Sequence, residues 1–164
     1  MRAHLDLLTG APPAGHHLDV ADPAVWARFG ADRACGPAPA GSAVRHCLAG
    51  DVLVDLAATA EARHLFVVLF GVPAAELAGF DDWFRSEHAP LLTAVPGWSR
   101  ARLVAPDAGP VTRAAVHDVA DLAALDSPER QRAGATAWTG RVFAGAWTKD
   151  VRRHVLRAAR GSNR

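Results

Sequence analysis

The sequence predicts an α+β fold in which helices cover one face of an antiparallel sheet. Residues 64–70, His-Leu-Phe-Val-Val-Leu-Phe, form a continuous apolar run that is typical of a strand buried on both faces. Residues 77–91 carry apolar side chains three or four positions apart, which is the spacing of an amphipathic helix. From residue 64 onward the predicted order is β-α-β-β-α-β, the split βαβ or ferredoxin-like pattern.

Residues 1–60 give weaker signals. We expect four elements there, in chain order: a strand over 3–9, a helix over 22–29, and strands over 43–48 and 52–58. Asp22 and Pro23 suit the N-cap and the first position of the helix. Ala49-Gly50-Asp51 would be the hairpin turn between the last two strands.

The boundaries are sharper after residue 64. The elements expected beyond the first strand are a helix over 77–91, strands over 98–105 and 111–119, a helix over 121–133, and a last strand within 142–157. Pro90 disfavours helical geometry at the residue before it, so His88 should lie near the helix end or just before a kink. Pro96-Gly97 turns the chain into the next strand, and Pro128 suits a helical start.

Two matching spacings point to an internal repeat. The pairs are both 57 positions apart (83 − 26 and 102 − 45): Trp26 with Trp83, and Arg45 with Arg102. In each half, the tryptophan lies on an expected helix and the arginine lies on a strand that follows it. We therefore expect residues 1–60 to be a degenerate or shortened copy of the complete half at 61–158, with 159–164 as a tail. Chance is the alternative explanation of the two spacings.

Length, composition and charge narrow the class of protein. At 164 residues the chain is one domain or two small fused halves. Half of the residues are apolar and 21% are charged, which is an ordinary globular composition. The net charge of +1 gives no electrostatic attraction to nucleic acid or to an anionic membrane, so we expect neither as a partner.

The cysteines and the apolar segments indicate the compartment. Cys35 and Cys47 have no metal-ligand spacing, so reduced thiols are expected, with a disulfide between them as the alternative. The N-terminal apolar run is too short for a signal peptide and is interrupted by Asp6. The most apolar segment ends at Pro73 and is about half the length needed to cross a bilayer. We therefore expect a soluble, cytoplasmic protein.

A longer pattern follows the apolar strand. It reads Trp83-x-x-x-Glu87-His88-x-Pro90 and then Val95-Pro96-Gly97-Trp98-x-Arg100-x-Arg102. This pattern resembles the dimeric α+β barrel superfamily, in particular its EthD-like members, and the similarity continues through 125–129 and 136–139. The resemblance implies a ferredoxin-like sheet whose uncovered face packs against a second sheet and encloses a cavity for a hydrophobic small molecule. It implies a homodimer, whereas an internally duplicated chain would close the barrel alone.

His88 is the first candidate for chemistry, because it is the polar member of the apolar helix stripe. Burial would lower its pKa and the helix C-terminus would raise it, so the pKa is expected near neutrality, as a general acid or base requires. The resemblance adds that the matching histidine borders the cavity in several members. The alternative is a core histidine that donates a hydrogen bond to a backbone carbonyl.

Arg100 and Arg102 alternate along the strand that follows the main helix, so we expect them to face the cavity together with Trp98. A guanidinium there would clamp a carboxylate or stabilise an enolate or phenolate oxygen. We favour Arg100 as a catalytic residue and Arg102 as a substrate-binding residue. The alternative is ion pairing with nearby carboxylates: Asp81, Asp82 or Glu87.

Aromatic side chains are the predicted walls of the binding site. The five candidates are Trp83, Phe84, Trp98, Trp138 and Trp147. Their flat apolar surfaces suit an aromatic or polycyclic ligand, although core packing explains any one of them equally well. His117, at the end of strand 111–119, is predicted to be the second proton-transfer group opposite His88, with a solvent-facing strand end as the alternative.

No cofactor or metal is expected, because the sequence has no glycine-rich phosphate loop, no haem-attachment motif and no histidine pair at ligand spacing. We therefore expect a cofactor-independent enzyme that acts on a hydrophobic cyclic or polyketide-like substrate by cyclisation, dehydration, isomerisation or decarboxylation. The resemblance implies natural-product biosynthesis as the setting. The alternatives are a barrel-type monooxygenase, cofactor-free or with haem held by His88 or His117, and a non-catalytic ligand-binding barrel.

Overall fold

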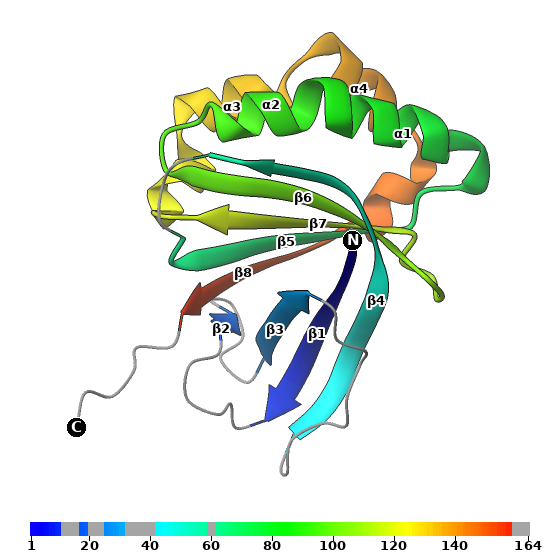
Figure 1. Cartoon of the computed structure of the whole chain (residues 1–164). Helices are drawn as coiled ribbons and strands as arrows, with labels where there is room; N and C mark the ends of the chain where they lie inside the picture. Colours follow the sequence, from blue (N-terminus) through cyan, green and yellow to red (C-terminus); the bar gives the residue numbers. More distant parts are fainter. Residues whose placement is uncertain (11–16, 20–24, 32–41, 59–61, 159–164) are drawn as a thin grey trace.

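The strands form a closed antiparallel barrel, and the helices cover one side of it (Figure 1). The computed structural model describes residues 1–10, 17–19, 25–31, 42–58 and 62–158. Within these residues the strands follow one another around the barrel in the order β1 (Arg2–Gly10), β3 (Val25–Ala31), β2 (His17–Asp19), β8 (Arg152–Ala158), β5 (His64–Phe70), β7 (Arg113–Val119), β6 (Trp98–Pro106) and β4 (Ser42–Ala57). Pairing of β4 with β1 closes the ring. The predicted α+β class, with helices on one face of an antiparallel sheet, is confirmed.

The helices fall into two groups. The first group runs without a break through η1 (Ala74–Glu76), α1 (Leu77–Trp83), the π-helical turn η2 (Phe84–His88) and α2 (Ala89–Thr93). The second group comprises η3 (Leu122–Asp126), α3 (Pro128–Gly134), α4 (Ala137–Val142) and η4 (Ala146–Asp150). No helix in the described part of the chain is long and apolar enough to cross a membrane.

The two halves of the chain share one strand order. Strands of residues 64–158 are arranged β8-β5-β7-β6, which is the ferredoxin-like order that the sequence predicts, and those of residues 2–57 are arranged β4-β1-β3-β2. The residues used to detect a repeat do not correspond, however. Trp26 lies on β3 and not on a helix, and Arg45 lies on the last strand of its half whereas Arg102 lies on the second strand of the other. A degenerate duplication therefore stays a prediction.

The helix predicted over 22–29 is wrong, because Val25–Ala31 is a strand that pairs with both β1 and β2. The residues that were expected to cap it lie outside the described residues, as do Cys35 and the expected tail. Cys47 is disulfide-bonded, so the expectation of a reduced thiol is wrong for this residue. A helix of this length is marginal by itself, and Val25, Trp26 and Phe29 are strand-forming residue types. Strand pairing in the barrel therefore overrides a local capping signal.

Strand β4 also differs from the prediction, because residues 42–57 form one strand and not a hairpin. It pairs with β1 as far as Asp51 and with β6 from Gly50 onward, so it links the two halves of the barrel. A Cβ added at Gly50 would overlap the carbonyl oxygen of Ala105. Only glycine permits this close approach of backbones, and it marks a change of partner strand.

The sheet separates two apolar clusters. The cluster inside the barrel consists of short aliphatic side chains: Ala3, Leu5, Leu7, Leu48, Leu65, Val67, Leu69, Val104, Val111, Ala114, Val116 and Leu156. Side chains of this size fill an eight-stranded barrel. The alternate positions Phe66, Val68 and Phe70 of β5 join the larger, aromatic cluster under the helices. The prediction that residues 64–70 form a strand buried on both faces is confirmed.

The main helix continues through Pro90 instead of ending before it. The backbone N–H of Ala89 bonds to the carbonyl of Phe84, five residues earlier, which is the π-helical spacing. Proline has no N–H and crowds the carbonyl four residues before it, and the wider turn accommodates both effects. His88, at the end of this turn, consequently projects from the middle of the helix.

The remaining elements agree with the prediction except at the last strand. The helix predicted over 121–133 is interrupted at Ser127, and α3 starts at Pro128 as expected. The Oγ atom of Ser127 caps α3 by accepting from Arg130 N at 3.1 Å. Strand β8 begins only at Arg152, because α4 and η4 occupy much of 137–150.

Candidate functional site

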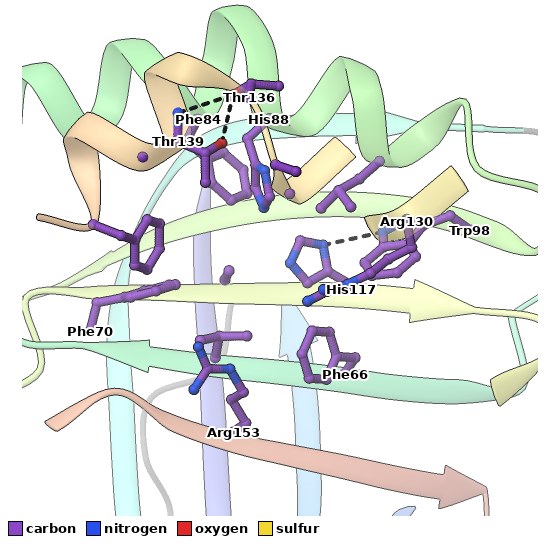
Figure 2. Close-up of a pocket in the computed structure, with 17 residues that line it drawn as sticks. Phe66, Phe70, Phe84, His88, Trp98, His117, Arg130, Thr136, Thr139 and Arg153 are labelled. Atoms are coloured by element: carbon purple, nitrogen blue, oxygen red, sulfur yellow. Dashed lines mark hydrogen bonds between the residues drawn. The ribbon is translucent and has the colours of Figure 1, made fainter. Parts of the chain in front are cut away.

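A hollow of about 410 Å³ lies between the helices and the outer face of the sheet (Figure 2). This volume falls within the range of about 300–1,000 Å³ that is usual for small-molecule sites. Its walls are mainly aromatic: Phe66, Phe70, Phe84, Trp98 and Phe143. Its polar lining residues are His88, His117, Arg130, Thr136, Thr139 and Arg153, and no described lining residue is acidic.

The hollow contains four of the predicted site residues: Phe84, His88, Trp98 and His117. Figure 2 shows His88 descending from the helix layer and His117 lying on the sheet below it. The two predicted proton-transfer groups thus line one cavity. Their catalytic roles remain predictions.

His88 is held by the π-helical turn and by its neighbours on the same helix. Its ring stacks on Trp83, with centroids 4.3 Å apart and an interplanar angle of 24°. Its Nδ1 atom is buried without a hydrogen-bond partner among the described residues. Burial, and secondly the positive charge of Arg130, lower the pKa of His88 to about 3. The predicted pKa near neutrality is therefore wrong, and His88 is a neutral imidazole at pH 7.

His117 is fully buried on β7 between two phenylalanine rings. It stacks on Phe66 and Phe84 with centroid separations of 5.8 Å and 6.1 Å. The indole N–H of Trp98 donates a hydrogen bond to its Nδ1 at 3.3 Å. Burial lowers the pKa of His117 well below its usual value, and the electrostatic interactions with His88, Arg102 and Arg130 act in the same direction. A solvent-facing position, the alternative to a site role, is excluded by this burial.

Trp98 reaches the hollow because β6 contains an irregularity. The register of β6 against β7 shifts between Trp98 and Arg100, so Ser99 behaves as a bulge residue. A regular strand would place Trp98 on the same face as Arg100 and Arg102, as the sequence predicts. The bulge instead turns Trp98 to the face that the helices cover, where it contacts His117.

Arg100 and Arg102 do not reach the hollow. They alternate with Ala101 and Leu103, which pack under the helices, so they lie on the barrel-interior face of β6. Arg102 pairs with Asp118 at 2.5 Å, and Arg100 forms a two-point contact with Asp55 at 2.5 Å. Both arginines therefore belong to ion pairs within the sheet, and the expectation that they share a cavity with His88 is wrong.

The carboxylates expected as alternative partners of these arginines bind other residues: Asp81 pairs with Arg113, Asp82 pairs with Arg85, and Glu87 contacts Thr136.

The other predicted tryptophans lie outside the hollow. Trp83 is buried in the core, and its indole N–H donates to Thr139 Oγ1 at 3.1 Å. Trp138 and Trp147 line a second, smaller hollow of about 240 Å³ beside α1. The indole N–H of Trp147 donates there to Glu76 Oε2 at 2.8 Å. Trp83 therefore supports the first hollow from outside, through its contacts with His88 and Thr139.

Two arginines that the sequence did not single out line the hollow: Arg130 of α3 and Arg153 of β8. Neither guanidinium has a hydrogen bond or ion pair with another described residue, in contrast to Arg132, which pairs with Glu129 on the outer side of α3. The Ser127 cap is the signal that points to Arg130. It fixes the start of α3, so Arg130 and Gly134 fall on the same, sheet-facing side.

Comparison with solved structures supports the fold. The chain matches a protein from Lactobacillus acidophilus assigned as a monooxygenase, with a TM-score of 0.66, 10% identity, and coverage of 96% of this chain and 93% of that one. It also matches an anthrone oxidase-like protein (TM-score 0.61, 12% identity, 96% and 91% covered) and a major regulator of staphylococcal pathogenesis (0.63, 9%, 98% and 100%). No protein-family model and no curated protein matches the sequence.

These similarities define a class of fold and no particular reaction, because the identities are low and the neighbours include both enzyme-like proteins and a regulator. The chain has the ferredoxin-like α+β barrel architecture. The residues that line the hollow, and not the fold, indicate what the protein does.

Proposed function

We propose that the protein is a cofactor-independent oxygenase that acts on a flat aromatic molecule of the phenol or anthrone type. The observation that supports this most is the composition of the hollow. Two neutral histidines lie among aromatic walls, together with two arginines that have no partner among the described residues. No described lining residue is acidic. Names of similar structures, including a monooxygenase and an anthrone oxidase-like protein, agree with this proposal.

The proposed reaction begins with loss of a proton from the substrate. In an anthrone-type molecule the proton leaves a CH₂ group beside a carbonyl-conjugated ring, and the resulting negative charge is carried largely by oxygen. His88 would accept the proton, since an oxyanion bound next to it raises its pKa above the value in the empty hollow. Arg130 would stabilise the oxygen. The aromatic walls exclude water and strengthen both interactions.

The carbanion then reduces O₂, which is the co-substrate and the only oxidant. One oxygen atom enters the substrate and the other leaves as water, so that CH₂ and O₂ become C=O and H₂O. Both electron pairs come from the two C–H bonds of the substrate, and no flavin or metal is needed for the balance. Cyclisation, dehydration, isomerisation and decarboxylation share the first proton transfer but consume no O₂.

The haem-dependent variant of this proposal fits the histidines poorly. A histidine that ligates iron normally donates its other ring N–H to a neighbouring group. His117 instead accepts from Trp98 at Nδ1, and the buried Nδ1 of His88 has no partner among the described residues. An absorbance scan for a Soret band in purified protein tests this variant.

Oxygen uptake in the presence of anthrone tests the proposal. We expect stoichiometric O₂ consumption, and a loss of about 100-fold or more in rate for His88→Gln, because general acid–base groups contribute at least that much. His64→Gln, on β5 outside the hollow, is the matched control and should retain the rate. Anthrone binding without O₂ consumption would favour a binding barrel, and conversion without O₂ would favour the proton-transfer reactions.

EthD-like membership, a homodimer, a cytoplasmic location and a role in natural-product biosynthesis belong to the same proposal. The barrel is already closed within one chain, so a dimer would form through another surface than the sheet face.

A further inference from the structure

We propose that the hollow binds its ligand as an oxyanion, with the Nε2–H of His117 as the central hydrogen-bond donor and Trp98 as the residue that fixes this proton on Nε2. The inference rests on the proposed site but not on reaction with O₂. It defines the ligand class as acidic phenols and enols, whose oxygen is ionised when bound.

The hydrogen bond from Trp98 determines the tautomer of His117. An indole nitrogen can only donate, so the nitrogen that it contacts must carry a lone pair. That nitrogen is His117 Nδ1, at 3.3 Å from Trp98 Nε1. A neutral imidazole that accepts at Nδ1 carries its single proton on Nε2. His117 is therefore a permanent donor and not a base.

The position of Trp98 is itself well determined. The bulge at Ser99 turns the indole toward the helices, and its ring meets Phe66 edge-on at 6.1 Å and His117 at 5.1 Å. Trp98 and His117 are both almost completely buried. The donor and the acceptor thus have little freedom to separate, and Trp98 acts as a positioning residue.

The other polar groups of the hollow also favour an anion. Arg130 and Arg153 are donors without partners among the described residues, and the described lining contains no acidic side chain. Thr136 and Thr139 are already engaged, with Thr136 Oγ1 at 2.5 Å from Glu87 Oε1 and at 2.9 Å from Thr139 Oγ1.

A neutral O–H group needs an acceptor, and the only histidine nitrogen left to accept among the described lining residues is on His88. An ionised oxygen can instead accept from several donors at once: His117 Nε2–H, Arg130 and Arg153.

The charged and titratable groups around His117 come from every element packed against it. They are His88 on the helix, Arg130 on α3, Arg153 on β8 and, on the far face of the sheet, Arg102 with its partner Asp118. The three arginines of this set outnumber its single carboxylate. The electrostatic potential at the hollow is therefore positive and favours a negatively charged ligand.

The proposal is tested with 4-nitrophenol, whose neutral and ionised forms absorb at different wavelengths. We expect the bound probe to ionise at a pH at least one unit below the free probe, which corresponds to about tenfold tighter binding of the phenolate than of the phenol. Arg130→Gln should abolish most of this shift. Arg132→Gln, on the outer side of the same helix, should leave it unchanged.

The tautomer is tested separately by the ¹⁵N NMR shifts of the His117 ring. The wild-type protein should show the proton on Nε2, and this measurement stands even if a variant does not fold. Trp98→Phe keeps an aromatic ring but removes the N–H. We expect it to release the tautomer into a mixture and to reduce the ionisation shift of 4-nitrophenol.

Three outcomes would overturn the inference: a bound probe that ionises at the same or a higher pH than free probe, a proton on Nδ1 of His117, or tighter binding of nitrobenzene than of 4-nitrophenolate. The outcome for the proposed function is independent. If the protein binds 4-nitrophenolate but consumes no O₂ with anthrone, the oxygenase proposal is refuted and the oxyanion site remains. If it consumes O₂ with anthrone but binds 4-nitrophenol in its neutral form, the oxyanion site is refuted and the oxygenase proposal remains.

Discussion

At the scale of single residues, the two histidines of the hollow share burial but differ in how each is held. Trp98 determines which nitrogen of His117 carries the proton, whereas the buried Nδ1 of His88 has no partner among the described residues. An unsatisfied buried nitrogen costs about 1–3 kcal/mol. Such a cost is typical of a functional group that stability alone would not retain.

Burial of His88 makes the stability of the fold depend on pH. Its pKa is about 3 in the folded protein and near 6.5 when unfolded, so below pH 6.5 only the unfolded chain binds the proton. The free energy of unfolding is therefore fully retained above pH 6.5 and falls toward pH 3. Between pH 7 and pH 5 this residue should account for a loss of about 2 kcal/mol.

Urea unfolding of the wild type and of His88→Gln at both pH values measures this loss. The variant should lose about 2 kcal/mol less than the wild type over the interval, whatever its stability at pH 7. Parallel pH dependences in the two proteins would show that His88 protonates as readily in the folded state as in the unfolded state.

At the scale of elements, two local departures from regular geometry build the site. The π-helical turn at 84–88 carries Phe84 and His88 over the sheet, and the bulge at Ser99 brings Trp98 beneath them. Both departures are common near functional sites. A third local feature is Gly50 of β4. It allows this strand to change its pairing partner from β1 to β6 and so to join the two halves of the barrel.

Substitution of two glycines tests the role of this strand. Gly50→Ala should lower the free energy of unfolding by about 2–3 kcal/mol, since the added methyl group overlaps the backbone of Ala105. Gly79→Ala, in α1, is the matched control. Nothing lies within 4 Å of its added Cβ, so it should stabilise the protein by about 0.5–1 kcal/mol. Equal effects of the two substitutions in thermal or urea unfolding would contradict the proposed close approach.

At the scale of the whole molecule, the features that the sequence predicts are those with a local signal. The strand at 64–70, the main helix and the helical start at Pro128 follow from periodicity and local helix-start signals within a few residues. The partner change at Gly50 and the bulge at Ser99 depend on pairing with distant strands, which no local pattern encodes.

The lining of the hollow follows from the sequence only in part, and the roles of its residues stay predictions. Phe84, His88, Trp98 and His117 line it as the sequence predicts, but its arginines lie on α3 and β8 and not on β6. Alternation along β6 correctly grouped Arg100 with Arg102, yet it could not tell which face of the sheet holds the cavity. Arg130 comes to the hollow only through the docking of α3 on the sheet, which is a tertiary property.

The location of the bound ligand tests the central claim most directly, and the side-chain N–H signals of the tryptophans report it in one NMR titration with 4-nitrophenol. Trp98 contacts the first hollow, whereas Trp138 and Trp147 line the second. We predict that the Trp98 signal shifts in proportion to the fraction of protein bound while the Trp147 signal stays in place. Saturating binding that shifts Trp138 and Trp147 and leaves Trp98 unchanged would contradict the account.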